Sequence, residues 1–460
     1  MKNIFYNLFY ILLGALIIMA PTFYNGFPLV YSDTGTYINS GMKGFVPNDR
    51  PALYGLFIKA TSLGFSLWLV VFMQCLILSY ILWLVFKLIV KNDQVKYTFI
   101  LVLVFLTAFT SIGWYAGQIM PDIFTPICIL SMGLLLFYKE IKSINTLVVS
   151  GIFIFSTGVH FSNIIIALLL LFTVFIFVKV KRSYFIMTFS LLVLSLLSVG
   201  IINYSIEKKF RMSKSGSVFI MGRLIDSGVL KTFLQDKCPT QDYELCACKD
   251  SLPRNSREFL WYDSSPLQKM GGWDNPSGEF SEIIFDVFKS PKHGMIFIGN
   301  SLSSSFSQLF QNEIGSGLIS EWYEQKGSPP YDAIATYFPN QLNSYLISRQ
   351  NKNIWRQGLN FDLINTINYL LLIGSMLFVI LIFHQKTIWN NISQATKYLL
   401  IICVLGIIIN AIVTATLANI YDRLQARVSW MLILSVLLVI VGNYKIIAVP
   451  IKGKINYLFK

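Results

Sequence analysis

The sequence predicts an all-α polytopic membrane protein with about ten transmembrane helices and one mostly helical or irregular extracytoplasmic insert. Of the 460 residues, 55% are hydrophobic and 13% are charged, whereas soluble domains carry roughly 25% charged residues. Several apolar runs reach the roughly 20 residues that a helix needs to cross a bilayer core. A soluble chain would expose large parts of this apolar surface to water, so an array of soluble domains is excluded.

The apolar runs divide the chain into two membrane regions. An N-terminal region, 1–204, contains an outer loop at 23–65, and a polar insert at 205–357 separates it from a C-terminal region, 358–460. The first run is expected to be an uncleaved anchor and not a signal peptide, because the chain that follows is itself apolar. Spans are expected near residues 4–22, 66–90, 97–114, 121–138, 146–160, 162–178, 184–204, 358–383, 398–416 and 428–443.

The net charge of +14 lies in short basic clusters between the apolar runs. Such clusters mark cytoplasmic loops that face membrane lipid, so both termini are expected inside and the insert outside. Between Arg211 and Arg356 acidic and basic residues nearly cancel, and no basic surface there suits nucleic acid. The clusters are Lys87, Lys91 and Lys96; Lys139 and Lys142; Lys179, Lys181 and Arg182; Lys386 and Lys397; and Lys445, Lys452, Lys454 and Lys460.

The two outer segments carry local signals. Asn48-Asp49-Arg50-Pro51 predicts a helix start with a capping side chain, followed by a short amphipathic helix at 52–59 on the membrane surface. In the insert, Cys238, Cys246 and Cys248 lie where disulfides persist, and one bridge from Cys238 to either of the other two is expected. The remaining cysteines are interpreted as packing residues within apolar runs, namely Cys75, Cys128 and Cys403.

Three outer residues beside the spans are candidate catalytic groups, since charges near hydrocarbon are costly. Asp33, in Tyr31-Ser32-Asp33-Thr34-Gly35, is either a general base, a ligand of a divalent cation, or part of a turn. Asp122 follows Pro121 at the outer start of a span, where the pair also favours helix initiation. His160 lies at an outer turn between two spans and is either catalytic or an interface residue.

Three arginines are candidate phosphate ligands. Arg423 and Arg427 are four residues apart, so a helical turn would place both guanidinium groups on one face. Guanidinium groups bind phosphate through forked hydrogen bonds; the alternative is a salt bridge with Asp422 or a lipid headgroup contact. Arg50 either pairs with Asp49 or contacts a lipid phosphate. Carboxylates and arginines on one outer face suggest a site for a lipid phosphate that carries a leaving group.

These residues stand in motifs that resemble those of a known protein family. Ser32-Asp33-Thr34-Gly35-Thr36-Tyr37, Asp49-Arg50-Pro51 and Asp422-Arg423-Leu424-Gln425-Ala426-Arg427-Val428-Ser429-Trp430 resemble bacterial polytopic membrane proteins of the C-type glycosyltransferase superfamily, in a subfamily of no settled activity. The resemblance implies transfer of a sugar from a polyprenyl-phosphate-linked donor on the periplasmic side of the bacterial inner membrane. It implies no acceptor. The sequence lacks the Asp-x-Asp or Glu-x-Asp pair in loop 23–65, which leaves the use of a divalent cation open.

By this resemblance, Asp33 is the base or metal-linked carboxylate, Asp122 is a second acidic group, and Arg423 or Arg427 binds the donor phosphate. The insert pattern is also similar and implies a Cys238–Cys246 bridge. An O-antigen polymerase or ligase is an alternative, with essential arginines in the insert. A transport or assembly protein is another, although the spans hold few charges and no repeat is visible. The insert arginines are Arg211, Arg223, Arg254 and Arg257.

Overall fold

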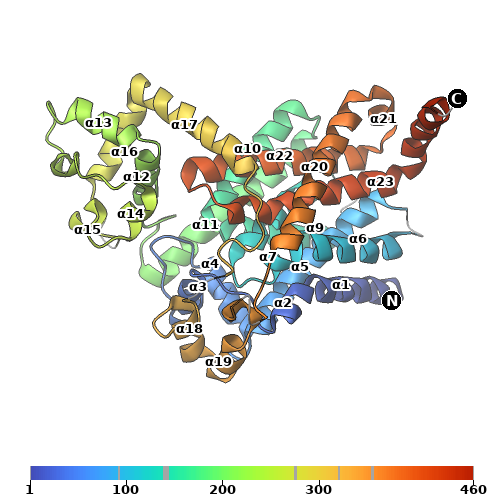
Figure 1. Cartoon of the computed structure of the whole chain (residues 1–460), viewed down its shortest axis with the longest axis horizontal. Coiled ribbons are helices and arrows are strands. Elements are labelled where there is room, and N and C mark those ends of the chain that lie inside the picture. Colours follow the sequence, from blue (N-terminus) through green and yellow to red (C-terminus); the bar gives the residue numbers. More distant parts are fainter. Residues whose placement is uncertain are drawn as a thin grey trace.

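The computed structural model describes residues 2–91, 94–137, 144–273, 277–319, 322–353 and 357–458. Within these ranges the chain is helical, and a single isolated bridge replaces any sheet. A body of long helices carries a smaller helical lobe at one end, joined to it by α17 (Pro291–Leu309) (Figure 1). The all-α prediction is confirmed. Of the predicted basic clusters, Lys139, Lys142 and Lys460 lie outside the described residues.

The body is built from apolar helices. Five helices of the described residues are long and apolar enough to cross a membrane. They are α5 (Leu67–Ile89), α11 (Arg182–Glu207), α20 (Asp362–His384), α22 (Gln394–Leu417) and the first part, 422–443, of α23 (Asp422–Leu458). Shorter apolar helices are α1 (Lys2–Ile18), α6 (Val95–Phe109), α8 (Phe124–Phe137), α9 (Ile144–Gly158) and α10 (Phe161–Phe177).

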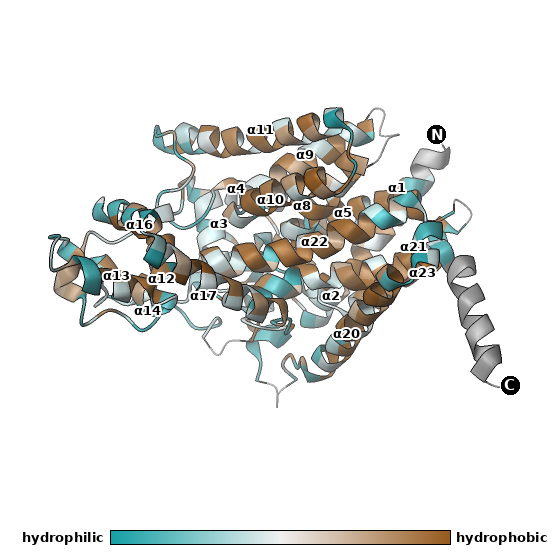
Figure 2. Ribbon diagram, turned by 90° about the horizontal axis from the view of Figure 1, so that it is seen from above, coloured by the Kyte–Doolittle hydropathy of each residue, from teal (hydrophilic) through white to brown (hydrophobic). Residues whose placement is uncertain are grey.

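This composition is typical of a helical membrane protein, and hydrophobic residues cover the helices of the body (Figure 2). Helices α11 and α20 bury little of their apolar surface inside the protein, so their outer faces suit contact with lipid. The start of α1 and the short helix α21 (Lys386–Asn391) lie at the end of the body opposite to the lobe (Figure 1). The number of ten spans stays a prediction.

Short helices lie among the long helices of the body. They are α2 (Ala20–Asn25), α3 (Thr34–Lys43), α4 (Leu53–Ser62), α7 (Ile112–Ala116) and the 3₁₀ helix η1 (Pro121–Ile123). Helices α3 and α4 approach closely because Gly41 and Gly55 face each other: a Cβ on Gly41 would lie 1.9 Å from the carbonyl oxygen of Gly55. The predicted capping by Asn48 or Asp49 was wrong. The N-cap is Ala52, which makes no side-chain cap bond, and Arg50 binds the Asp49 carboxylate instead.

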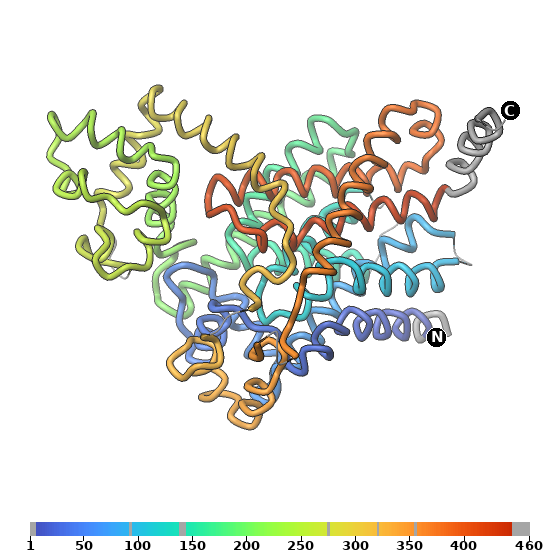
Figure 3. Tube along the Cα trace, in the orientation of Figure 1, coloured from blue at the N-terminus to red at the C-terminus, as the bar shows by residue number. Residues whose placement is uncertain are grey.

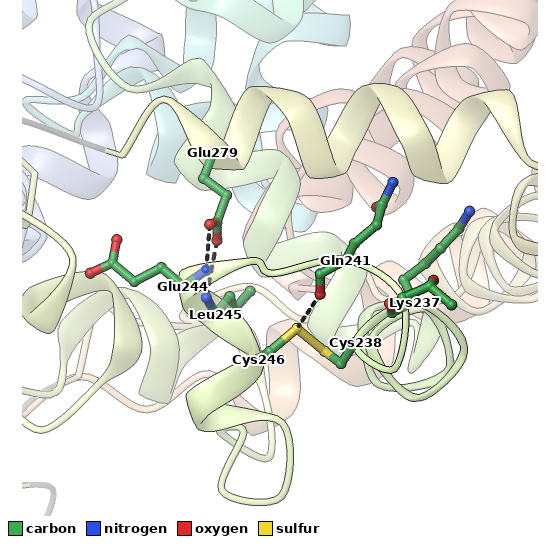
Figure 4. The surroundings of a disulfide bond; sticks show 8 residues. Lys237, Cys238, Gln241, Glu244, Leu245, Cys246 and Glu279 are labelled. Atoms are coloured by element: carbon green, nitrogen blue, oxygen red, sulfur yellow. Dashed lines mark hydrogen bonds between the residues drawn. A yellow bond between two sulfur atoms is a disulfide. The ribbon is translucent and has the colours of Figure 1, made fainter.

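The lobe has a hydrophobic core of its own. It comprises α12 (Gly216–Asp226), α13 (Val229–Lys237), η2 (Glu244–Cys248), α14 (Ser256–Trp261), α15 (Pro266–Lys269) and α16 (Glu279–Lys289). A disulfide joins Cys238 and Cys246, the pairing that the resemblance implies. Beside it, the Glu279 carboxylate accepts the backbone N–H groups of Glu244 and Leu245 at 2.6 and 3.0 Å and so caps η2 (Figure 4).

The rest of the insert belongs to the body. After α17 the chain forms α18 (Pro329–Tyr337), α19 (Pro339–Leu346) and η3 (Arg349–Asn351), and α18 packs against α3 (Figure 3). Tyr323 and Tyr345 join the main core. The Gln350 side-chain amide accepts the Val30 N–H at 3.0 Å and donates to the Val30 carbonyl at 2.6 Å. The region predicted as one insert therefore divides between two cores.

Candidate functional site

Asp33 and Asp122 lie close together because two distant loops pair. The loops form the isolated parallel bridge, in which the Leu29 carbonyl accepts the Ile119 N–H at 2.9 Å. The Thr34 hydroxyl donates to the Ile119 carbonyl at 3.1 Å. This pairing fixes the start of α3, where Asp33 is the N-cap residue, beside η1, which carries Asp122.

Arg50 completes one side of the site from the loop between α3 and α4. Its Nη2 lies 3.3 Å from Asp33 Oδ1. Its Nε donates to Asp49 Oδ1 at 2.9 Å, and a second bond joins Nη2 to Asp49 Oδ2. The guanidinium also lies 4.8 Å from the centroid of the Tyr37 ring. Arg50 therefore has a forked carboxylate partner and an aromatic support.

The first turns of α23 supply the other side. Arg427 Nη1 lies 3.3 Å from Asp122 Oδ1, and Arg423 Nη1 lies 3.6 Å from Asp122 Oδ2. Arg423 Nη1 also lies 3.8 Å from Asp33 Oδ2. The spacing of four residues places both guanidinium groups at one carboxylate, and Arg423 bridges the two aspartates.

Arg427 is wholly buried, and its Nη1 and Nη2 have polar partners, whereas its Nε lacks an acceptor. Its Nη2 donates to Asn410 Oδ1 at 3.1 Å and to the Ser162 hydroxyl at 3.4 Å. Asn410 is itself fixed, since its amide donates to the Leu424 carbonyl at 2.7 Å. A buried charge is tolerated when it is paired and hydrogen-bonded. Arg427 and Asp122 thus form a fixed base beneath the site.

His160 joins this base through Ser162. It is the N-cap residue of α10, and its Nδ1 accepts the Ser162 N–H at 3.2 Å and lies 2.8 Å from the Ser162 hydroxyl. Because Nδ1 accepts the backbone N–H, the ring proton is assigned to Nε2. Burial and the positive charge of Arg427 lower the pKa of His160 to about 3. The imidazole is therefore neutral at physiological pH.

Solvent access differs sharply among the charged groups. The side chain of Asp33 is 29% exposed, those of Arg423 and Arg50 are 14% and 11% exposed, and those of Asp122 and Arg427 are 2% and 0% exposed. Burial raises the pKa of Asp33, but the positive charges of Arg50 and Arg423 outweigh it and hold the pKa below its usual value. Asp33 is thus the ionised carboxylate that a ligand reaches first.

Of the three arginines of the site, Arg423 makes the fewest hydrogen bonds. Within the described part of the chain its side chain makes no hydrogen bond, and its Nε and Nη1 lack an acceptor, as do Arg50 Nη1 and Arg427 Nε. The Arg423 guanidinium carbon lies 4.1 Å from the centroid of the Tyr31 ring. A buried donor without an acceptor costs about 1–3 kcal/mol. Guanidinium donors without an acceptor are groups to which an anion can bind.

Among the described residues, no group of three or more His, Cys, Asp or Glu side chains is arranged to hold a metal ion. Each oxygen of Asp33 and of Asp122 faces a guanidinium group instead. Positive neighbours oppose the binding of a divalent cation. The arginines themselves supply the positive charge that a phosphate needs.

The structure gathers all six predicted residues, namely Asp33, Arg50, Asp122, His160, Arg423 and Arg427. Sequence reasoning missed Tyr31, Ser162 and Asn410 as parts of the site. Asn410 carried a signal, because an asparagine inside an apolar run usually has a partner. In the insert, Arg211 and Arg223 pair locally, with Glu207 at 2.5 Å and Asp226 at 3.2 Å.

The chain matches no protein-family model, no curated protein and no solved structure.

Proposed function

We propose that this protein is a glycosyltransferase that moves a sugar from a polyprenyl-phosphate-linked donor to an acceptor on the periplasmic face of a bacterial inner membrane. In this proposal about ten helices span the membrane, both termini are cytoplasmic and the lobe is periplasmic. The observation that carries it is the accessible Asp33 carboxylate between Arg50 and Arg423, two arginines with unfilled donors.

The arginines suit the leaving group. Arg423, helped by Arg50, binds the lipid phosphate through its free donors. The bond between the phosphate oxygen and the anomeric carbon breaks, and the growing negative charge on the phosphate is stabilised by fixed guanidinium groups. These groups are in place before the reaction, so little reorganisation is needed when the charge develops.

Asp33 is the proposed general base. The acceptor hydroxyl attacks the anomeric carbon, and its proton passes to the Asp33 carboxylate. In the empty site the arginines hold the pKa of Asp33 low, which makes it a weak base. A bound phosphate offsets their positive charge, so the pKa of Asp33 rises when the donor is present. The base is thereby strengthened by its own substrate.

Asp122 and His160 are proposed to position other side chains and not to contact the substrate. Asp122 is almost completely buried and holds both Arg423 and Arg427. His160 orients Ser162, which accepts a hydrogen bond from Arg427. Both therefore act on the donor through Arg423, whose place on α23 they stabilise.

The test uses purified full-length protein in liposomes with a panel of polyprenyl-phosphate sugars. The readout is release of polyprenyl phosphate, the product common to any acceptor. Asp33→Asn should lower the rate by about 10²–10⁴-fold and keep binding of polyprenyl phosphate, measured by native mass spectrometry. Arg423→Gln should weaken that binding.

The controls make the same changes of charge outside the site. Asp362→Asn changes an exposed carboxylate at the start of α20, and Arg211→Gln changes an insert arginine that pairs with Glu207. Both should leave binding and release unchanged. Undiminished release by Asp33→Asn, or no binding of polyprenyl phosphate by the wild-type protein, would refute the proposal. Loss of release in Arg211→Gln alone would favour the polymerase or ligase alternative.

A further inference from the structure

Helix α17 has an inverted distribution of polar and apolar residues. The face turned toward the protein includes the polar residues His293, Ser301, Ser305 and Gln308, together with Phe297, which joins the core of the lobe. The opposite face carries five large apolar side chains, each 57–73% exposed. We call this face the α17 stripe; it consists of Met295, Ile298, Leu302 and Phe306 of the helix and of Phe310, its C-cap residue.

The spacing of the stripe makes it one continuous face. Successive members are three or four residues apart, which aligns them along one side of a helix. A helix in water shows the reverse pattern, with apolar residues inside and polar residues outside. Contiguous exposed apolar patches of this kind are rare on soluble surfaces. The stripe is therefore built for an apolar surrounding.

The end of α17 is fixed to two helices of the body. The Gln308 amide donates to the Tyr421 carbonyl at 2.9 Å and accepts the Tyr421 N–H at 3.0 Å, just before α23 begins. The Asn312 N–H donates to the Tyr369 hydroxyl of α20 at 3.3 Å. The next residue of α20, Leu370, is a largely exposed apolar side chain. The stripe thus ends beside an apolar outer face of α20.

Helix α17 also packs closely along α22 as it leaves the body (Figure 1). Ser301 and Ser305 are buried on α17, and small side chains of this kind permit helices to approach closely. Because α22 is one of the helices able to span a membrane, a helix that lies against its outer end reaches the depth of the outer leaflet.

We infer that the α17 stripe is a lipid-binding surface that lies in the acyl-chain region of the outer leaflet and holds the lobe against the membrane. The occupant is bilayer lipid. Its polar border is marked by Asn300, Ser303 and Ser307, which are exposed beside the stripe, and Asn300 donates to the Ser227 carbonyl of the lobe at 2.7 Å. This inference rests on the membrane orientation of the proposed function, in which the lobe is periplasmic, and not on the catalytic role of the site.

The test places a nitroxide spin label on single cysteines in the full-length protein, reconstituted in liposomes of phosphatidylcholine and phosphatidylglycerol. The background is Cys248→Ser, because the other free cysteines of the described residues, Cys75, Cys128 and Cys403, are buried. Labels at Leu302→Cys and Phe306→Cys report on the stripe. Ser307→Cys, on the polar border, is the matched control.

Collision of each label with oxygen, which concentrates in hydrocarbon, is compared with collision with a water-soluble nickel chelate. The ratio of oxygen to nickel accessibility should be severalfold higher at 302 and 306 than at 307. Equal nickel accessibility at all three positions would show that water covers the stripe, and would overturn the inference. Protection of 302 and 306 from both reagents, with spin–spin broadening, would show a second copy on the stripe and would also overturn it.

Discussion

Replacement of Asp122 by asparagine should destabilise the protein through the positive charge it leaves behind. The carboxylate lies 3.3 Å from Arg427 and 3.6 Å from Arg423. Neither Asp122 nor Arg427 is open to water, so no solvent replaces the lost charge. Removal of one partner of a buried ion pair costs about 3–5 kcal/mol. Because Asn410 and Ser162 still accept from Arg427, we expect the lower end, about 3 kcal/mol.

The assay is a double-mutant cycle on unfolding of the protein in detergent micelles, followed by tryptophan fluorescence. Asp122→Asn and Arg427→Met are compared with the double variant, which leaves no unpaired charge at this pair. The double variant should be less destabilised than the sum of the single variants, because an apolar replacement of a buried pair is often tolerated.

The control is the exposed ion pair between Asp236 and Lys292 in the lobe. Asp236→Asn should change the stability much less, since exposed pairs contribute little. Strict additivity in the Asp122–Arg427 cycle, or an Asp122→Asn variant as stable as the wild type, would refute the reasoning that this pair is energetically coupled.

Three further changes have defined outcomes. Gly41→Ala should lower the free energy of unfolding by about 1–3 kcal/mol and reduce turnover. The added Cβ would lie 1.9 Å from the Gly55 carbonyl oxygen and push the α3–α4 loop that carries Arg50. Thermal unfolding and the release assay measure the two effects. His160 is neutral in the folded protein and takes up a proton near pH 6.5 in the unfolded chain. The free energy of unfolding should therefore fall as the pH drops from about 6.5 toward 3, and it should fall less in His160→Gln. Loss of the Cys238–Cys246 bridge should cost about 2.5 kcal/mol by the chain-entropy relation for its separation of 8 residues, seen as faster proteolysis of the lobe.

Each of these changes has a control in the same chain. Gly151→Ala lies in α9 with no atom within 4 Å of the added Cβ, so it should not reduce turnover. His384→Gln, exposed at the end of α20, should keep the pH dependence of the wild type. Cys248→Ser removes the free thiol beside the bridge and should leave proteolysis unchanged. The opposite result for any control would assign the effect to the substitution type and not to the contact.

The sequence singled out six residues that the structure brings together, but it did not predict how they meet. Asp33, Asp122 and Arg423 were grouped because apolar runs and basic loops placed them on one side of the membrane. Their contact depends on the backbone pairing of Leu29 with the loop before η1. Such a pairing between two short loops leaves no side-chain pattern, so sequence periodicity cannot detect it.

The limits of the insert were also hidden from composition. Residues 205–357 are polar on average, yet Tyr323 and Tyr345 join the main core while the lobe keeps its own. The reason is local: Gln350 binds the backbone of Val30 and so attaches the second half of the insert to the outer loop. A hydropathy average cannot distinguish a polar residue in water from one that satisfies buried backbone groups.

The three arginines of the site differ in their hydrogen-bond partners, and this difference supports the roles proposed for them. Arg427 is buried with Asp122, Asn410 and Ser162 as partners. Arg50 has the forked Asp49 partner. Arg423 reaches its two carboxylates at 3.6 and 3.8 Å, beyond the 2.7–3.2 Å of an N–H···O hydrogen bond. In the proposed function, a phosphate would therefore form its first bonds at Arg423, which makes no hydrogen bond among the described residues, and its charge would act directly on Asp33, the carboxylate that Arg423 also faces.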